Sequence, residues 1–189
     1  DNLRFIRAHN SEADAGLHSF RLGVNQFSDL TQAEWRAEAL APTPLSLQPE
    51  SERNVLRLSP VGSAATIDWR TKGAVTPVKN QGHCGACWAF STTGSTESVF
   101  QIATGALRSL SEQQLVDCAG GKWGNKGCQG GIMEKGYKYI VANGGIDGEN
   151  EYTYNATNGA CWTAAEKRHV RAVGSPLLHS GGRYQNRWP

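Results

Sequence analysis

Apolar and polar positions along the chain predict helices separated by loops. The apolar residues and alanines that follow Cys87, with no proline until much later, favour a helix that begins at this cysteine and stops at Gly105. A second helical stripe, ended by the glycines after Asn143, consists of four apolar residues: Ile132, Tyr137, Ile140 and Val141. The pattern therefore predicts two longer helices from Cys87 onward.

A shorter helix is predicted between these two. Ser111 and Gln114 have the spacing of a capping box, and Leu110 with Leu115 has that of a hydrophobic staple. Glycines then dominate residues 119–131. This stretch predicts a loop with little side-chain bulk.

The first 40 residues are rich in charge and predict a helix, a turn and a second helix. Asn2, Ile6 and Asn10 recur at every fourth position, which places them on one helical face. Thr31 and Glu34 fit a capping box for the second helix. Across residues 41–65 the composition shifts to Pro, Ser, Leu and Gln without periodicity, so an extended segment is expected.

Composition narrows the classes of protein. The length of 189 residues suits one or two domains, and a net charge of +2 is too small to indicate nucleic acid or an anionic membrane as a partner. No apolar run of about 18 residues predicts a transmembrane helix. Five cysteines suggest two disulfides and one free thiol, which is typical of an oxidising compartment. Asn155-Ala156-Thr157 is a glycosylation sequon compatible with such a compartment.

Candidate chemistry gathers in the stretch of residues 81–90. Cys87 is expected at a helix N-terminus, where unpaired N–H groups and the positive end of the helix dipole favour an anion such as a thiolate. Gln81, on the preceding loop, can offer an amide N–H to a carbonyl oxygen that gains negative charge. Cys87 is therefore a candidate nucleophile and Gln81 a candidate oxyanion donor.

Two other interpretations of Cys84 and Cys87 remain open at this point. Their spacing is also that of a thioredoxin-like redox pair or of half a zinc site. A zinc site needs a second close pair of ligands. The remaining cysteines are scattered singly, at Cys118, Cys128 and Cys161.

The segment Cys84-Gly85-Ala86-Cys87-Trp88 fits the signature of papain and the cathepsins. The chain thus resembles a papain-family, cathepsin L-like cysteine protease precursor. The resemblance implies an α+β, papain-like fold, represented here mainly by the helical left domain behind a helical propeptide. It also implies that Cys87 is the nucleophile, that Gln81 is the oxyanion-hole donor and that Cys84 is a disulfide partner.

The N-terminal residues resemble the inhibitory propeptide of the same family. Asn2, Ile6 and Asn10 match the last three positions of its ERFNIN pattern, and residues 23–29 match its G-x-N-x-F-x-D motif. Residues 67–70 resemble the start of a mature enzyme. The resemblance implies four regions: an N-terminally incomplete propeptide at 1–40, an extended linker with the activation site at 41–65, the left domain at 66–162 and an atypical tail at 163–189.

The resemblance also selects one disulfide pairing among those that the sequence permits: Cys84 with Cys128, and Cys118 with Cys161. Cys128-Gln129-Gly130-Gly131 resembles the family's C-x-G-G loop beside the nucleophile. The implied substrate-binding residues are four: Gly85, Gly130, Gly131 and Met133. An alternative is that Ile132 and Met133 are simply core residues at the start of a helix.

The catalytic histidine and asparagine of the family are expected roughly 130–150 residues after the cysteine. Neither His169 nor His179 has the family's sequence context, and His83 occupies a position that varies in the family. The β-rich right domain is accordingly expected to be largely absent from this sequence. The prediction is a cysteine endopeptidase zymogen, present as an incomplete chain that is inactive as it stands.

Two alternatives are a non-catalytic protease inhibitor that acts through its propeptide, and a catalytically silent secreted remnant. The expected partners are peptide or protein substrates and the chain's own propeptide, with no nucleic acid and no membrane. No cofactor or metal is expected. The expected location is secreted or lysosomal/vacuolar.

Overall fold

The computed structural model describes residues 1–39 and 66–162. The chain divides into two compact units, one up to Leu40 and one from Ala41 onward, and each is considered by itself. The predicted linker at 41–65 and the predicted tail at 163–189 lie outside the described residues. No helix of the described ranges is long and apolar enough to cross a membrane.

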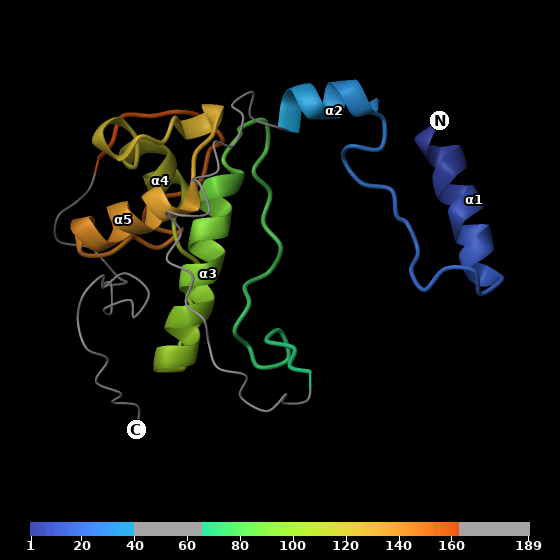
Figure 1. The fold of residues 1–189 in the computed structure, drawn as a ribbon, viewed down its shortest axis with the longest axis horizontal. Helices are drawn as coiled ribbons and strands as arrows, with labels where there is room; N and C mark the ends of the chain where they lie inside the picture. Colours follow the sequence, from blue (N-terminus) through green and yellow to red (C-terminus); the bar gives the residue numbers. More distant parts are fainter. Residues whose placement is uncertain (40–65, 163–189) are drawn as a thin grey trace, which may run out of the picture. The chain divides into compact units, whose positions relative to one another are not determined.

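The described residues are mainly helical (Figure 1). Residues 1–39, the described part of the N-terminal unit, have two helices, α1 (Asn2–Asp14) and α2 (Gln32–Ala39). Residues 66–162, the described part of the second unit, have three α-helices and two short 3-10 helices: α3 (Cys87–Thr104), α4 (Glu112–Cys118), η2 (Gly121–Trp123), η3 (Gly127–Gln129) and α5 (Met133–Asn143). In place of strands, the described part of the chain has an isolated antiparallel bridge between Leu110 and Gly148. This arrangement agrees with the predicted helical left domain.

The face of α1 predicted to carry Asn2, Ile6 and Asn10 contacts the loop between α1 and α2. Asn2 Nδ2 donates to the carbonyl oxygens of Ser28 (3.0 Å) and Leu30 (2.9 Å). Asn10 donates to Leu22 O and accepts from Leu22 N, both at 2.8 Å. The two asparagine side chains thus form hydrogen bonds with backbone groups of the loop that would otherwise lack partners.

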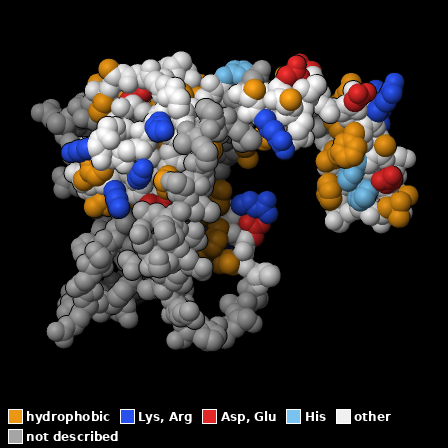
Figure 2. All heavy atoms as spheres, turned by 45° about the horizontal axis from the view of Figure 1, so that its top comes forward, with side chains coloured by type: hydrophobic (Ala, Val, Ile, Leu, Met, Phe, Trp, Pro, Cys, Tyr) orange, Lys and Arg blue, Asp and Glu red, His pale blue; other side chains and the backbone are white. Residues whose placement is uncertain are grey.

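The predicted capping box at α2 is confirmed. Thr31 N donates to Glu34 Oε2 (2.7 Å), and Glu34 N donates to Thr31 Oγ1 (3.2 Å). The hydrogen bonds from Thr31 hold the pKa of Glu34 below its ordinary value. Figure 2 shows orange hydrophobic side chains beside the pale-blue histidines of this unit, and the large exposed ones are Leu3, Phe5, Leu17, Phe20 and Val24.

The core of the second unit is built around α3. Trp88 and Ala89, just after Cys87, are fully buried, and α5 crosses α3 where Gly136 meets Thr92. The other buried hydrophobic members of this core are Cys84, Ala86, Leu110, Leu115, Val116, Ala119, Tyr139, Ile140 and Ile146. Gly105 ends α3 in the left-handed conformation, as the sequence predicted.

Two details differ from the sequence prediction. Ser111 Oγ accepts from Gln114 N (2.9 Å), but the reciprocal half of the predicted capping box is not made. Instead Asp147 accepts from Ser111 N (3.0 Å), and Gln114 Oε1 accepts from Asp147 N (2.7 Å). The backbone of Asp147 thus takes the place of the reciprocal capping bond, because it pairs with both Ser111 N and Gln114 Oε1.

The predicted stripe of α5 is also shifted. Val141 is exposed and Ile132 precedes the helix as its N-cap, while the buried residues of α5 are Gly136, Tyr139 and Ile140. Gly136 lies at the contact with α3. The face of α5 that packs against α3 is therefore the one that carries this glycine.

Replacing Gly136 by alanine should destabilise the second unit. A Cβ atom at this position would lie 2.7 Å from Thr92 Oγ1 and 3.0 Å from Thr92 Cγ2, so α5 or the Thr92 side chain must shift. Overpacking of this kind costs about 1–3 kcal/mol. Urea unfolding followed by circular dichroism measures the change in the free energy of unfolding.

The matched control is Gly94→Ala, in the middle of α3, where a Cβ atom would have no neighbour within 4 Å. This change should stabilise the protein by about 0.5–1 kcal/mol, because alanine loses less backbone entropy in a helix. Equal effects of the two substitutions would contradict the close contact between α3 and α5.

Candidate active site

Cys87 is the first residue of α3, and its side chain is exposed. The helix start is fixed by Ala86, whose carbonyl oxygen accepts from Ala89 N (2.8 Å) and Phe90 N (3.2 Å). Trp88 and Ala89 are buried immediately behind the cysteine. The thiol is therefore held at the positive end of an 18-residue helix that cannot easily shift.

Two disulfides leave Cys87 as the free thiol among the described residues. The structure joins Cys84 to Cys128 and Cys118 to Cys161. Beside the first bridge, Gly85 N donates to Cys128 O (2.9 Å). Because Cys84 is bonded to Cys128, it does not form a redox pair with Cys87. The described residues contain no group of three or more potential metal ligands.

Gln81 is held next to the cysteine loop by two hydrogen bonds. Its Nε2 donates to Cys84 O (2.9 Å), which fixes the plane of the amide. The Tyr154 hydroxyl donates to Gln81 O (2.7 Å). Burial and two nearby acids raise the pKa of Tyr154 to about 12, so the hydroxyl stays protonated and remains a donor. Sequence reasoning missed Tyr154, which is 73 residues away and has no local pattern that marks it.

The glycine loop before α5 packs directly on the indole of Trp88. A Cβ atom on Gly131 would lie 2.6 Å from Trp88 Cδ2 and 2.6 Å from Asn125 Oδ1. Asn125 is buried and accepts from Ile132 N (2.8 Å). Asn125 was another residue missed from the sequence. Gly131 is therefore required by the local packing.

The other predicted substrate-binding residues have different surroundings. Gly85 is buried in the cysteine loop, and Gly130 is buried with φ at 108°, in the region that favours glycine. Met133 is partly buried and packs against the core. Partial burial fits both a core residue and a pocket wall, so the two interpretations of Met133 from the sequence both stay open.

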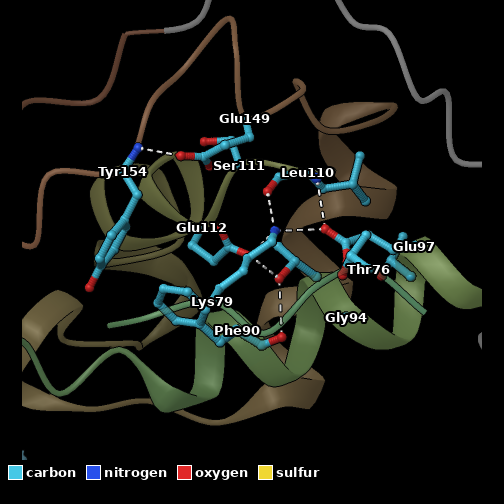
Figure 3. A network of polar contacts seen from close by, with 12 residues as sticks. Thr76, Lys79, Phe90, Gly94, Glu97, Leu110, Ser111, Glu112, Glu149 and Tyr154 are labelled. Atoms are coloured by element: carbon cyan, nitrogen blue, oxygen red, sulfur yellow. Dashed lines mark hydrogen bonds and ion pairs between the residues drawn. The ribbon is translucent and has the colours of Figure 1, made fainter. Parts of the chain in front are cut away.

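A buried ion cluster anchors the segment that leads to Gln81 (Figure 3). Lys79 Nζ donates to Glu97 Oε1 (2.8 Å) and Glu112 Oε1 (2.7 Å), and both carboxylates are 1% exposed. Thr76 and the Leu110 backbone also donate to Glu97, and Thr93 donates to Glu112 Oε1. Desolvation alone would lower the pKa of Lys79, but its bonds to Glu112 and Glu97 raise it, so the ammonium stays charged.

A cavity of about 320 Å³ adjoins this cluster. Its lining residues are Lys79, Asn80, Phe90, Ser109, Glu112, Glu149 and Tyr154. Glu112 Oε2 and Glu149 Oε2 are both buried and receive no hydrogen bond from the described residues. Burial, followed by the charge of Glu112, raises the pKa of Glu149, although Tyr154 N and Lys79 oppose the shift. When Glu149 is protonated, its O–H is a donor of the kind that Glu112 Oε2 lacks.

The stability of the second unit should therefore depend on the protonation of Glu149. Because its pKa is raised in the folded protein, its contribution is fully present below the unfolded pKa and is lost as pH rises through the folded pKa. Glu149→Gln cannot ionise, and its free energy of unfolding should fall less than that of the wild type between about pH 4 and pH 8. Urea unfolding at a series of pH values measures the difference.

Glu134→Gln, an exposed position in the first turn of α5, serves as the control and should follow the wild-type profile. Parallel pH profiles for wild type and Glu149→Gln would show that Glu149 carries no such proton.

The five histidines of the sequence have different surroundings. His9 and His18 stack on each other in the N-terminal unit, with ring centroids 4.2 Å apart. His83 is exposed and directly precedes the disulfide cysteine Cys84. His169 and His179 lie outside the described residues.

Comparison with known proteins gives matches over most of the chain. Residues 63–179 match the family described as papain family cysteine protease, and residues 1–35 match the cathepsin propeptide inhibitor domain. Procathepsin L of Rattus norvegicus is 43% identical over 177 residues, covering 87% of this chain and 48% of the relative. Cysteine protease 1 of Oryza sativa subsp. japonica is 45% identical over 174 residues, covering 92% of this chain and 35% of the relative.

The structure gives a similar result. It matches that of a recombinant stem bromelain precursor with a TM-score of 0.73 and 35% identity, over 90% of this chain and 52% of the other. The chain thus spans about half or less of the length of these relatives.

Proposed function

Because the chain belongs to the papain family of cysteine proteases and carries a cathepsin propeptide inhibitor domain, we propose that it is a cysteine endopeptidase zymogen that hydrolyses peptide bonds. The observation that carries the proposal is the exposed, unbridged thiol of Cys87 at the N-terminus of α3. The proposed regions are the propeptide at 1–40, the activation linker at 41–65, the left domain at 66–162 and a tail at 163–189.

In the proposed reaction, Cys87 Sγ attacks the carbonyl carbon of a peptide bond and forms an acyl-enzyme. The carbonyl oxygen gains negative charge as this bond forms. We assign the donor to that oxygen to the Gln81 amide, and its bond to Cys84 O, which orients the amide, supports the assignment. Tyr154 acts through Gln81 as a positioning residue, because its hydroxyl holds the Gln81 backbone.

We assign substrate binding to Gly85, Gly130, Gly131 and Met133. Glycines at 130 and 131 let an extended peptide approach the backbone closely and pair with it as a strand does. Met133 would contact the second residue on the acyl side of the scissile bond. Its partial burial suits a shallow apolar pocket wall.

We further propose that residues 1–189 alone turn over substrate poorly. Expulsion of the amine needs an acid, which in a cysteine–histidine pair is the imidazolium, and each proton-transfer role contributes about 10²–10⁴-fold. None of the five histidines stands in the family's sequence context. Thiol reactivity and peptide turnover should therefore separate in this chain.

The test combines alkylation with a peptidase assay. Iodoacetamide without reductant should label one cysteine, Cys87, because the other four are bridged. After removal of the propeptide, hydrolysis of a fluorogenic dipeptidyl substrate with an apolar second residue should stay near background. Intact mass and peptide mapping locate the label.

Cys87→Ala is the matched control and should lose the label. A label on Cys84 would show that the nucleophile has been assigned wrongly. Turnover by the wild type that disappears in Cys87→Ala would overturn the proposed inactivity while leaving the endopeptidase assignment intact.

The N-terminal unit supports a second function, that of an inhibitor of related proteases. Residues 1–35 match the propeptide inhibitor domain, and the unit is held together by its own hydrogen bonds. We propose that it blocks the cleft of its own protease before activation, and that the precursor is sorted to secretion or to a lysosomal or vacuolar compartment. The two disulfides support an oxidising route.

A peptide of residues 1–62 should inhibit a cathepsin L-like protease more strongly than a serine protease. Asn10→Ala removes both bonds to Leu22, which costs the unit about 1–3 kcal/mol and should weaken inhibition roughly tenfold. Inhibition constants measured for both peptides against both proteases provide the comparison. Equal inhibition of the two protease classes would reject the propeptide function.

A further inference from the structure

The loop of residues 155–157 contains an exposed asparagine that the protease chemistry does not use. We propose that Asn155 is the acceptor for one N-linked glycan, transferred from a polyprenyl-diphosphate-linked oligosaccharide. The sequence Asn155-Ala156-Thr157 is the one Asn-x-Ser/Thr triplet in the 189 residues. The triplet alone is a short pattern, and the structure adds that the folded loop can carry a sugar on Asn155.

The triplet folds into a turn closed by the acceptor side chain itself. Asn155 Oδ1 accepts from Thr157 N (3.0 Å) and from Thr157 Oγ1 (2.7 Å). Ala156, between them, has φ at 60°, a conformation that residues other than glycine seldom adopt. The turn therefore brings the hydroxyl of the third residue against the carboxamide of the first.

The two polar atoms of the Asn155 carboxamide have separate roles. Oδ1 receives both hydrogen bonds of the turn, whereas Nδ2 donates no hydrogen bond to the described residues. Glycan transfer joins Nδ2 to the anomeric carbon of the sugar, and Nδ2 gives up one proton to a base of the transferase. The bond from that carbon to the diphosphate oxygen breaks, and the polyprenyl diphosphate leaves with the electron pair.

The folded protein can keep its turn after this reaction. The glycan occupies Nδ2 and leaves Oδ1 to accept the same two hydrogen bonds. The backbone on both sides is fixed to α4 by the buried Gln113, whose Oε1 accepts from Asn155 N (3.1 Å) and whose Nε2 donates to Thr157 O (2.7 Å). Asn155 and Thr157 are themselves exposed, so the sugar would extend into solvent from a rigid base.

The disulfides of the second unit point to the compartment in which such transfer occurs. Two disulfides, Cys84–Cys128 and Cys118–Cys161, require an oxidising environment, and N-glycosylation belongs to the same secretory route. The proposal is independent of peptidase turnover, because it needs the secretory route and the turn but not the chemistry of Cys87.

The full 189-residue chain, fused to a cleavable secretion signal, should be translated with microsomes and also secreted from eukaryotic cells. The wild type and Thr157→Ser should each gain one glycan. The control Asn150→Gln, which changes an asparagine outside the triplet, should also gain one. Peptide N-glycosidase should remove it and leave aspartate at position 155. Asn155→Gln and Thr157→Ala should gain none, as measured by intact mass and peptide mapping.

Transfer in microsomes precedes folding, so this arm gives a result even for a variant that fails to fold. Unmodified Asn155 in the wild-type chain from both sources overturns the proposal. Glycosylated wild type should be recovered as a soluble monomer with Cys87 as its one alkylated thiol. Glycosylation in microsomes without recovery of that folded form overturns the claim that the folded turn accommodates the sugar.

Discussion

The ammonium group of Lys79, on a partly buried side chain, joins segments that are distant in the sequence. Glu97 lies in α3 and Glu112 begins α4, and both carboxylates are almost fully removed from water. Loss of one partner from a buried ion pair leaves an uncompensated charge, at a cost of about 3–5 kcal/mol. The extended chain before Cys84 must therefore stay against both helices, and Gln81, two residues after Lys79, is brought to the start of α3.

Local patterns in the sequence predicted the structure where local bonds determine it. Thr31 and Glu34 cap α2 reciprocally, Asn2 and Asn10 share a face of α1, and the helix from Cys87 ends at Gly105. Each of these features depends on groups a few residues apart or on one helical face. The disulfide pairs needed the family resemblance, since spacing alone permits several arrangements.

Tertiary contacts were beyond the reach of the same reasoning. Nothing near Lys79 marks Glu97 and Glu112 as its partners, and nothing near Gln81 marks Tyr154. Val141 fits an apolar stripe but is exposed, because Gly136 is needed where α5 crosses α3. The Gln114 side chain accepts from Asp147 N and not from the N–H of its own helix cap, because the Asp147 backbone needs a buried partner. In each case a neighbour distant in sequence decided the outcome.

The hydrogen bond from Tyr154 to Gln81 and the two disulfides set an order for assembly during synthesis. The bridges interleave, since Cys118 lies between Cys84 and Cys128 while its partner Cys161 follows both. A nascent chain that ends before residue 154 holds Cys87 without the support of the loop beside it. Until Cys161 emerges from the ribosome, Cys118 has no native partner and can be captured by Cys87 or Cys84. Vectorial synthesis thus exposes the free thiol of Cys87 before its surroundings are complete.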